Sequence, residues 1–186
     1  MLQEAAFELF LENSYAGTSI DQITQRAGVS RNTFFNYFGV KSDVFWVDLD
    51  YSIGQLVSAL KQSSPAVPIM QAVSDAIIQL GGEFGPSRVP FALTQYPLIG
   101  SVHELQASAL VRFTQLAKVL HDFLSRHRTA PNSLLAQAAA FAALGATVAA
   151  AQAWAAAGTT RGALEPYLTA ALEPVVAGFQ AKFDNA

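Results

Sequence analysis

The sequence predicts an all-α protein in two parts: a three-helix head over residues 1–47 and a larger helical body over residues 48–186, with about nine helices in total. Apolar residues recur three and four positions apart along most of the chain, which is the spacing of an amphipathic helix. Clusters of Gly, Pro and Ser separate these segments and mark their ends. Of the 186 residues, 52% are hydrophobic and only 13% are charged, so we expect a folded core.

The first two helices of the head are indicated by periodicity and by capping residues. Residues 2–13 place apolar side chains on one face and three glutamates, four positions apart, on another, as an amphipathic helix does. A second helix is expected over residues 20–27. Two capping boxes fit its start: Thr18 with Asp21, or Ser19 with Gln22.

A tight turn and a third helix follow directly. Gly28 stands where a helix can end in left-handed backbone geometry without steric cost. Ser30 can cap a third helix, expected over residues 31–38. A short helix, a tight turn and a second short helix form a helix-turn-helix, which places its second helix in the major groove of DNA. This is the most specific signal in the chain.

The third helix divides by period into an inner and an outer face. Phe34 and Phe38 can pack inward, while Arg31, Asn32, Phe35 and Asn36 project outward. Arg can contact guanine, Asn adenine, and Phe a thymine methyl group, whereas Lys41 suits phosphate. Alternatively, the polar residues form an ordinary solvated face and Phe35 belongs to the core, but their joint position after the turn favours DNA. The expected DNA-contacting residues are Thr18, Ser30, Arg31, Asn32, Thr33, Phe35, Asn36, Tyr37 and Lys41.

About 40 consecutive residues of the head resemble the N-terminal signature of the TetR repressor family. The resemblance implies a DNA-binding head, a fourth helix that links it to a dimeric ligand-binding body, and release from an operator when ligand binds. The matching residues are Ala6, Leu9, Phe10, Tyr15, Thr18, Ser19, Ile23, Ala27, Gly28, Val29, Ser30, Thr33, Tyr37, Phe38 and Lys41.

Three positions depart from the family pattern. Asn32 replaces a common Gly, Phe35 replaces a Tyr that often contacts phosphate, and Ser14 stands where a Gly usually precedes Tyr15. The runs 31–38 and 41–46 are similar to an actinobacterial subgroup that contains mycofactocin-associated regulators. For some of these, the resemblance implies fatty acyl thioester effectors.

The body is expected to contain six helical segments. The last two, including an Ala-rich one without Lys, Arg, Asp or Glu from 134 to 158, resemble the family's dimerisation pair, and we expect a homodimer. A spanning helix needs about 20 apolar residues, but two Gln in this segment favour a buried or dimer-forming helix over a membrane span. The expected segments are 42–62, 68–80, 88–99 as a broken short helix, 101–127, 133–157 and 162–182.

Aromatic residues in the body suggest a pocket for a small, largely apolar or amphipathic effector, because ligand pockets are mostly apolar with a few polar groups. Core packing is the alternative for each aromatic residue. If Arg112 faces inward it needs an acidic partner or an anionic ligand group; if it faces water it has no special role. The candidate ligand-binding residues are Phe91, Gln95, Tyr96, Arg112, Phe113, Gln137, Phe141 and Trp154.

Composition excludes several other functions. The chain has no Cys, so disulfides and thiolate chemistry are absent, and we expect a cytoplasmic protein. We find no catalytic motif and therefore expect no enzyme and no cofactor. His103, His121 and His127 do not form a convincing metal set. Residues 1–50 carry three cationic and seven acidic side chains, which is unusual for a DNA-binding surface. A helical ligand-binding or interaction protein of the same fold that has lost DNA binding is therefore the alternative.

Overall fold

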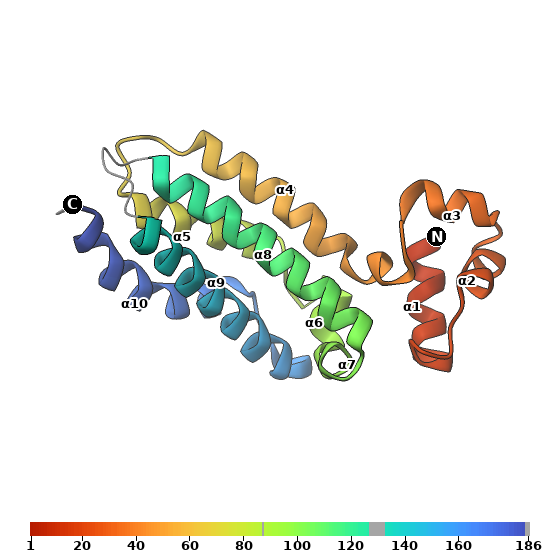
Figure 1. Cartoon of the computed structure of the whole chain (residues 1–186). Helices are drawn as coiled ribbons and strands as arrows, with labels where there is room; N and C mark the ends of the chain where they lie inside the picture. The colour runs from red at the N-terminus through yellow and green to blue at the C-terminus, as the bar shows by residue number, and fades with distance from the viewer. Residues whose placement is uncertain (87, 127–132, 185–186) are drawn as a thin grey trace.

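The computed structural model describes residues 1–86, 88–126 and 133–184, and within these ranges the all-α prediction is confirmed. Ten α-helices and two 3-10 helices account for the regular structure, and one isolated bridge joins Gly85 to Arg88. Helices α1 to α3 form a separate head at one end, and the helix α4 runs from it along an elongated body (Figure 1). The C-terminal end lies at the far end of that body (Figure 1).

The head has the helices that its capping residues predict. They are α1 (Leu2–Asn13), α2 (Ile20–Ala27) and α3 (Arg31–Tyr37). Of the two possible capping boxes, Ser19 with Gln22 forms: the Ser19 Oγ accepts from the Gln22 N–H at 3.2 Å, and the Gln22 Oε1 accepts from the Ser19 N–H at 2.8 Å. Gly28 ends α2 with a φ of 68°, which only glycine adopts without strain.

Ser14 ends α1 in a conformation that is costly for its residue type. Its φ is 65° and its ψ is 164°, a combination found almost only for glycine. The Ser14 Oγ accepts a hydrogen bond from the Gly17 N–H at 3.2 Å, which offsets part of the strain. The departure from the family's usual Gly at this position therefore has a structural cost.

The expected single helix from Ser42 begins instead as a 3-10 helix, η1 (Lys41–Trp46), before α4 (Val47–Gln62). Ser42 is buried and does not cap α4. The Asp43 carboxylate accepts from the N–H groups of Gly39 and Val40, both at 3.0 Å, and so fixes the start of the 3-10 turn. Trp46, with φ −109° and ψ 5°, separates the two helices.

Four long helices pack with α4 to form the body: α5 (Ile69–Gly81), α8 (His103–Arg126), α9 (Ser133–Ala156) and α10 (Glu165–Asp184), with η2 (Gly158–Thr160) before α10. A Cβ on Gly81 would lie 2.1 Å from the Leu168 Cδ1, so a larger residue where α5 meets α10 would require the buried Leu168 side chain to shift. The expected end of the long helix at His127 lies outside the described residues.

The broken segment before the long helix is two helices, α6 (Phe91–Thr94) and α7 (Tyr96–Ser101), so the described chain has ten α-helices rather than about nine. Pro97 lies in the first turn of α7, where its missing N–H costs no helical hydrogen bond. The short helices bring Phe91 to the head.

The head and the body have separate apolar cores that meet at this point. The head core extends into the body through Ala92 and Leu105, which are both buried in it. Phe91 stacks on Phe7 with ring centroids 3.8 Å apart and makes an edge contact with Phe45 at 5.2 Å. The head is therefore held by packing as well as by its connection to α4.

Candidate nucleic-acid interface and ligand-responsive body

The two faces of α3 are divided as its period predicts. Phe34 is fully buried and packs against Phe38 with ring centroids 5.3 Å apart. The adjacent Phe35 is 46% exposed, and Tyr37 is 74% exposed. Asn32 and Asn36 are also exposed. The helix therefore presents Phe35 and two amides to solvent while one aromatic side chain anchors it.

The start of α3 is fixed by its cap. The Ser30 Oγ accepts from the Thr33 N–H at 3.1 Å, and the two hydroxyls lie 2.9 Å apart. Both residues were expected to contact DNA, and both are at or near the protein surface. Their hydroxyl groups already stabilise the helix end, which orients the residues that follow.

Arg31 at the first position of α3 has a partner within the head. Its Nη1 donates to the Asp21 Oδ1 at 2.5 Å, and its guanidinium lies 5.6 Å from the centroid of the Phe35 ring. Both members of the ion pair are more than half exposed. Arg31 is thus placed beside the exposed face of α3, although an acidic side chain holds it.

Thr18 and Lys41, two other expected DNA contacts, have intramolecular roles. Thr18 is 2% exposed, and its hydroxyl lies 3.0 Å and 2.8 Å from the carbonyl oxygens of Leu9 and Ser14. The Lys41 ammonium donates to the Tyr15 and Thr18 carbonyls at 2.8 Å and 2.9 Å. Partial burial lowers the pKa of Lys41. Their contact with DNA stays a prediction.

The acidic residues of α1 are used to join it to α2. Arg26 donates to Glu8 at 3.2 Å and to Glu12 at 2.7 Å. The hydrogen bond from Arg26 lowers the pKa of Glu12. Two of the seven acidic side chains in residues 1–50 are therefore engaged with a cation inside the head.

Arg112 faces inward and has acidic partners, which is the first of the two alternatives the sequence left open. Its guanidinium contacts both oxygens of Asp50 at 2.7 Å and lies 3.5 Å from Asp43. It also lies 5.5 Å from the centroid of the Trp46 ring, and the Trp46 Nε1 donates to Ser108 at 2.7 Å. These contacts join α8 to η1 and α4.

The Asp43 carboxylate extends this network to the backbone just after α3. One oxygen lies near Arg112, and the other accepts from Gly39 and Val40, which follow α3 directly. Asp21, Asp43 and Asp50 were not among the expected site residues. For Asp21 the signal was present, because the first turn of one helix lies near the start of the next in a helix-turn-helix. For Asp50 and Arg112, 62 residues apart, no local pattern indicates the contact.

The other expected pocket residues are not brought together. Trp154 is fully buried and donates to the Gly162 carbonyl at 2.9 Å. Phe113 and Phe141 stack with ring centroids 5.9 Å apart, but Phe141 is 41% exposed. Tyr96 and Gln137 are also exposed. Gln95 lies between α6 and α7, where its backbone carbonyl accepts the Leu98 N–H.

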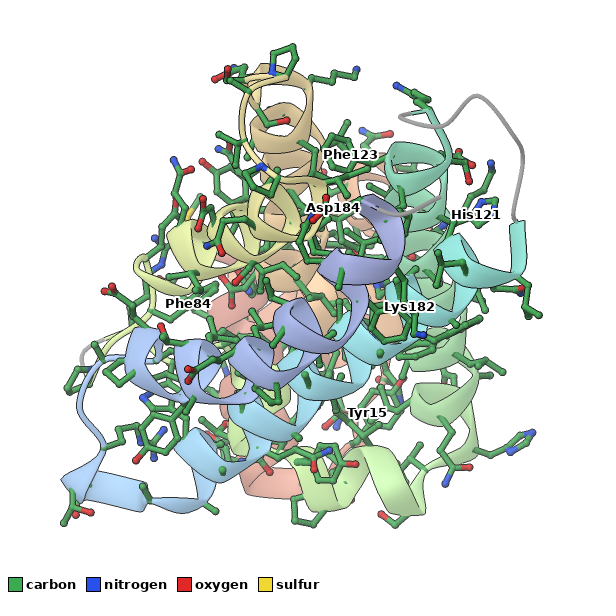
Figure 2. The ribbon with its side chains drawn as sticks, turned by 90° about the vertical axis from the view of Figure 1, so that its left-hand side faces the viewer. Tyr15, Phe84, His121, Phe123, Lys182 and Asp184 are labelled. Carbon is green, nitrogen blue, oxygen red and sulfur yellow. The ribbon has the colours of Figure 1, made fainter. Side chains whose placement is uncertain are left out.

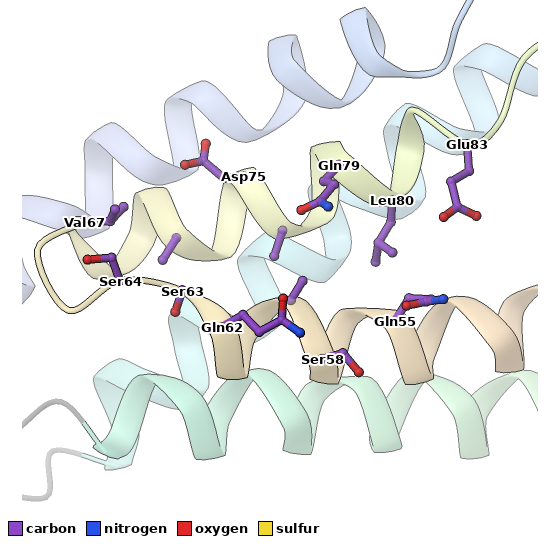
Figure 3. Close-up of a pocket in the computed structure, with 13 residues that line it drawn as sticks. Gln55, Ser58, Gln62, Ser63, Ser64, Val67, Asp75, Gln79, Leu80 and Glu83 are labelled. Carbon is purple, nitrogen blue, oxygen red and sulfur yellow. The ribbon is translucent and has the colours of Figure 1, made fainter.

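Two grooves lie along α4 instead. None of the eight candidate ligand-binding residues lines either groove. The larger one, of about 380 Å³, lies between α4 and α5 and is lined mainly by polar side chains, including Gln55, Gln62 and Asp75 (Figure 3). The second, of about 240 Å³, lies between α4 and α8 and combines apolar residues with Lys61 and Arg126. Which residues contact an effector stays a prediction.

Helices α9 and α10 lie side by side (Figure 2), and we call their exposed residues the α9–α10 face. Its large apolar members on α9 are Leu134, Phe141 and Val148, between 41% and 73% exposed. On α10 the exposed residues include the small ones Ala170, Pro174, Ala177 and Gly178 and the charged ones Glu165, Glu173, Lys182 and Asp184. Small side chains allow a second helix pair to approach closely.

The stretch Leu134–Ala156 of α9 is long and apolar enough to cross a membrane, with a mean hydropathy of 1.8. One third of this stretch is buried within the protein, and α9 packs against both α8 and α10. A helix of a soluble bundle gives the same composition. Within the described residues, no three His, Cys, Asp or Glu side chains gather as a metal site, and His127 lies outside those residues.

Known proteins with similar sequences and structures are transcriptional regulators. The chain is 25% identical over 150 residues to a Mycobacterium tuberculosis protein described as the mycofactocin biosynthesis transcriptional regulator MftR, covering 80% of this chain and 75% of that protein. It is 32% identical over 59 residues to the HTH-type transcriptional activator FasR of Mycolicibacterium smegmatis, and the match covers 32% of this chain and 27% of that protein.

The fold is that of solved regulators. FadR from Bacillus subtilis, in complex with stearoyl-CoA, has a TM-score of 0.65 at 20% identity over 95% of this chain and 97% of that one. Residues 2–45 match the tetR family of bacterial regulatory proteins, and residues 67–180 match the MftR C-terminal domain. The chain therefore belongs to the tetR family of transcriptional regulators, with a body of the MftR type.

Proposed function

We propose that the chain is a cytoplasmic repressor that binds a near-palindromic operator as a homodimer and leaves it when a small effector occupies the body. Residues 1–47 would be the DNA-binding domain, and residues 48–186 would bind ligand and form the dimer. The observation that carries the proposal is the exposed face of α3, which includes Asn32, Phe35 and Asn36. The start of this helix is capped, and buried Phe34 anchors it. The matched families are regulators, so we propose no catalytic activity.

The shared face of α9 and α10 supports the homodimer. It exposes apolar and small residues, and its α9 part has no charged side chain, which suits a symmetric four-helix contact with a second copy. Two heads must lie about 34–36 Å apart, or a multiple of that, to enter successive major grooves on one side of the duplex. A dimer held through the body can set this distance.

The effector that we propose is amphipathic and of the fatty acyl type. FadR of Bacillus subtilis binds stearoyl-CoA in its crystal structure, and this chain has the same overall fold. The second groove, between α4 and α8, is compatible with such a ligand because Lys61 and Arg126 lie beside apolar Leu60 and Val119. This pairing of cations with apolar walls suits an anionic group attached to a hydrocarbon chain.

The contacts between head and body offer a route for the response. Phe91 packs among head aromatic residues, and Arg112 joins α8 to α4 and η1. An effector that favours another position of α4 or α8 would change the spacing of the heads. Such a coupling between two sites is typically worth about 1–3 kcal/mol, which is fivefold to more than a hundredfold in operator affinity.

Two other functions remain as alternatives. The relative FasR is an activator, and a chain with that role would raise transcription from the promoter that it binds. The acidic head motivates a protein that has kept the fold but lost DNA binding. In the structure, two of the seven acidic side chains, Glu8 and Glu12, are paired with Arg26 inside the head, so part of that acidity has a role in holding the head together.

Titration of the full chain against the DNA upstream of its own gene tests the proposal. A repressor should bind a near-palindromic duplex far more tightly than a scrambled one, with affinity that falls steeply as salt rises. Adding a long-chain acyl-CoA should release the duplex, and transcription in vitro from the same DNA should be lowered by a repressor but raised by an activator. Equal weak binding to both duplexes would support the alternative without DNA recognition. Asn32→Ala should relax base preference at one position of each half-site.

A further inference from the structure

The ion pair between Asp21 and Arg31 lies at the edge of the exposed face of α3. The Arg31 Nη1 is 2.5 Å from the Asp21 Oδ1, and the side chains are 56% and 70% exposed. Arg31 is at the first position of α3, and Asp21 is in the first turn of α2. The two helices of the DNA-binding motif are thus joined by the same cation that would contact DNA.

The other cations of the head are not available in the same way. All head residues are described, and the two other cationic side chains are Arg26 and Lys41. Arg26 is held by Glu8 and Glu12 on the side of α1, and Lys41 donates to two backbone carbonyls. Arg31 is therefore the head cation that can reach DNA by exchanging one exposed acidic partner.

Breaking the ion pair with Asp21 costs free energy, and the net effect depends on which group of the DNA becomes the new partner of Arg31. An exposed ion pair is worth up to about fivefold in an equilibrium constant, and DNA brings its phosphates close to the Asp21 carboxylate. One phosphate offers Arg31 another anion but repels Asp21. A guanine edge instead offers a bidentate contact that discriminates by about fivefold to a hundredfold and carries no charge that repels Asp21.

We propose that Asp21 sets the stringency of DNA recognition: it holds Arg31 away from non-specific phosphate contacts and releases it to a matching base. The inference rests on DNA binding by α3. It explains why an acidic residue lies beside a DNA-reading surface, where simple attraction to DNA would favour a neutral or basic one. Asp21 is thus a specificity-determining residue although it need not contact a base.

The test compares Asp21→Asn with the wild-type chain on two duplexes, measured by fluorescence anisotropy over a range of salt. One duplex is an operator selected from a random library with the wild-type protein, and the other has random sequence. Asp21→Asn should bind the random duplex about three- to tenfold more tightly, with a salt dependence steeper by about one ion. The operator should gain less, so that the ratio of the two affinities falls.

Two controls separate this effect from a general change of charge. Asp184→Asn removes the same charge at the far end of the body and can still accept the hydrogen bond from Gln180; neither affinity should change. In an Arg31→Gln background, Asp21→Asn should have less than half of its original effect. Asp21 and Arg31 are exposed, so circular dichroism should report an unchanged fold.

Each outcome decides the inference. An unchanged affinity of Asp21→Asn for random DNA contradicts it, and so does an equal gain in the Arg31→Gln background, which would show that Asp21 acts as a distant charge. Equal gains on both duplexes also contradict it, because stringency would then be unaffected. If no operator can be selected from the library and the wild-type chain does not bind the random duplex at low salt, the proposed DNA binding itself is wrong.

Discussion

The head and the α9–α10 face present two different solutions to recognition. The head anchors a small helix with large aromatic residues, and its two arginines are paired with carboxylates inside the head. The α9–α10 face has small and apolar residues, and its α9 part has no charged side chain. The first surface suits a charged polymer that must be read selectively, and the second suits a copy of the same chain, which shape alone can select.

The largest expected effect comes from removing the anchor of the head. Phe34→Ala should destabilise the head by about 3–5 kcal/mol, because a fully buried aromatic side chain would leave a cavity. Thermal unfolding followed by circular dichroism measures the loss. The matched variant is Phe35→Ala: Phe35 is 46% exposed, so stability should change little while operator affinity falls. Equal destabilisation by both variants would contradict the division of α3 into two faces.

A charge on the α9–α10 face should have the next largest effect. Phe141→Glu would bury a carboxylate in the proposed dimer and should weaken it by about 2 kcal/mol, or roughly thirtyfold in Kd. Sedimentation velocity over a range of concentrations measures the change. Gln115→Glu adds the same charge to an exposed position of α8 and should leave the dimer intact. A dimer that tolerates Phe141→Glu does not use this face.

The network at the junction should have a smaller effect on stability. Arg112→Met keeps much of the side-chain volume but leaves Asp50 and Asp43 without their cation. Both carboxylates are partly exposed, at 44% and 31%, so water can replace part of the interaction and we expect a loss of about 1–2 kcal/mol. Urea unfolding measures it.

The exposed pair Arg88 with Glu83, 3.6 Å apart, provides the control for that prediction. Arg88→Met should change the free energy of unfolding by less than about 0.5 kcal/mol, as expected for a surface ion pair. A loss for Arg112→Met no larger than this would mean that the junction network adds nothing beyond a surface pair.

The smallest expected effect is a gain. Ser14→Gly should raise the free energy of unfolding by about 1 kcal/mol, because it removes the strain of a non-glycine residue at φ 65° and ψ 164°. The lost hydrogen bond to Gly17 and the greater freedom of the unfolded chain offset part of this gain. Ser14→Ala keeps the strain without the hydroxyl and should be less stable than the wild type. A lower melting temperature for Ser14→Gly would contradict the explanation.

Much of the head could be predicted from sequence because its signals are local. Gly28, Ser19 and Ser30 act on residues within three or four positions, and the helix ends follow from them. In the body, Pro and Gly clusters predicted most helix boundaries, but the 3-10 start at Lys41 depends on how Asp43 binds Gly39 and Val40. The tenth α-helix arises elsewhere, because the segment 88–99, expected as one broken short helix, forms both α6 and α7.

The candidate sites in the body could not be predicted in the same way. Whether Arg112 faces inward depends on Asp50 and Asp43 in a distant part of the sequence. An aromatic residue such as Trp154 has the same local pattern whether it lines a pocket or fills a core, and here it is fully buried with its indole N–H bonded to Gly162. Long-range packing decides these cases.

Because Phe91 and Arg112 reach into the head from the body, the head is not a portable module. A chimaera with residues 1–47 grafted onto another sensor would lack the Phe91 ring that stacks on Phe7 and the Arg112 guanidinium that pairs with Asp43. Biosensor engineering with this head would therefore have to transplant compatible residues at both positions, or select new ones in the recipient protein.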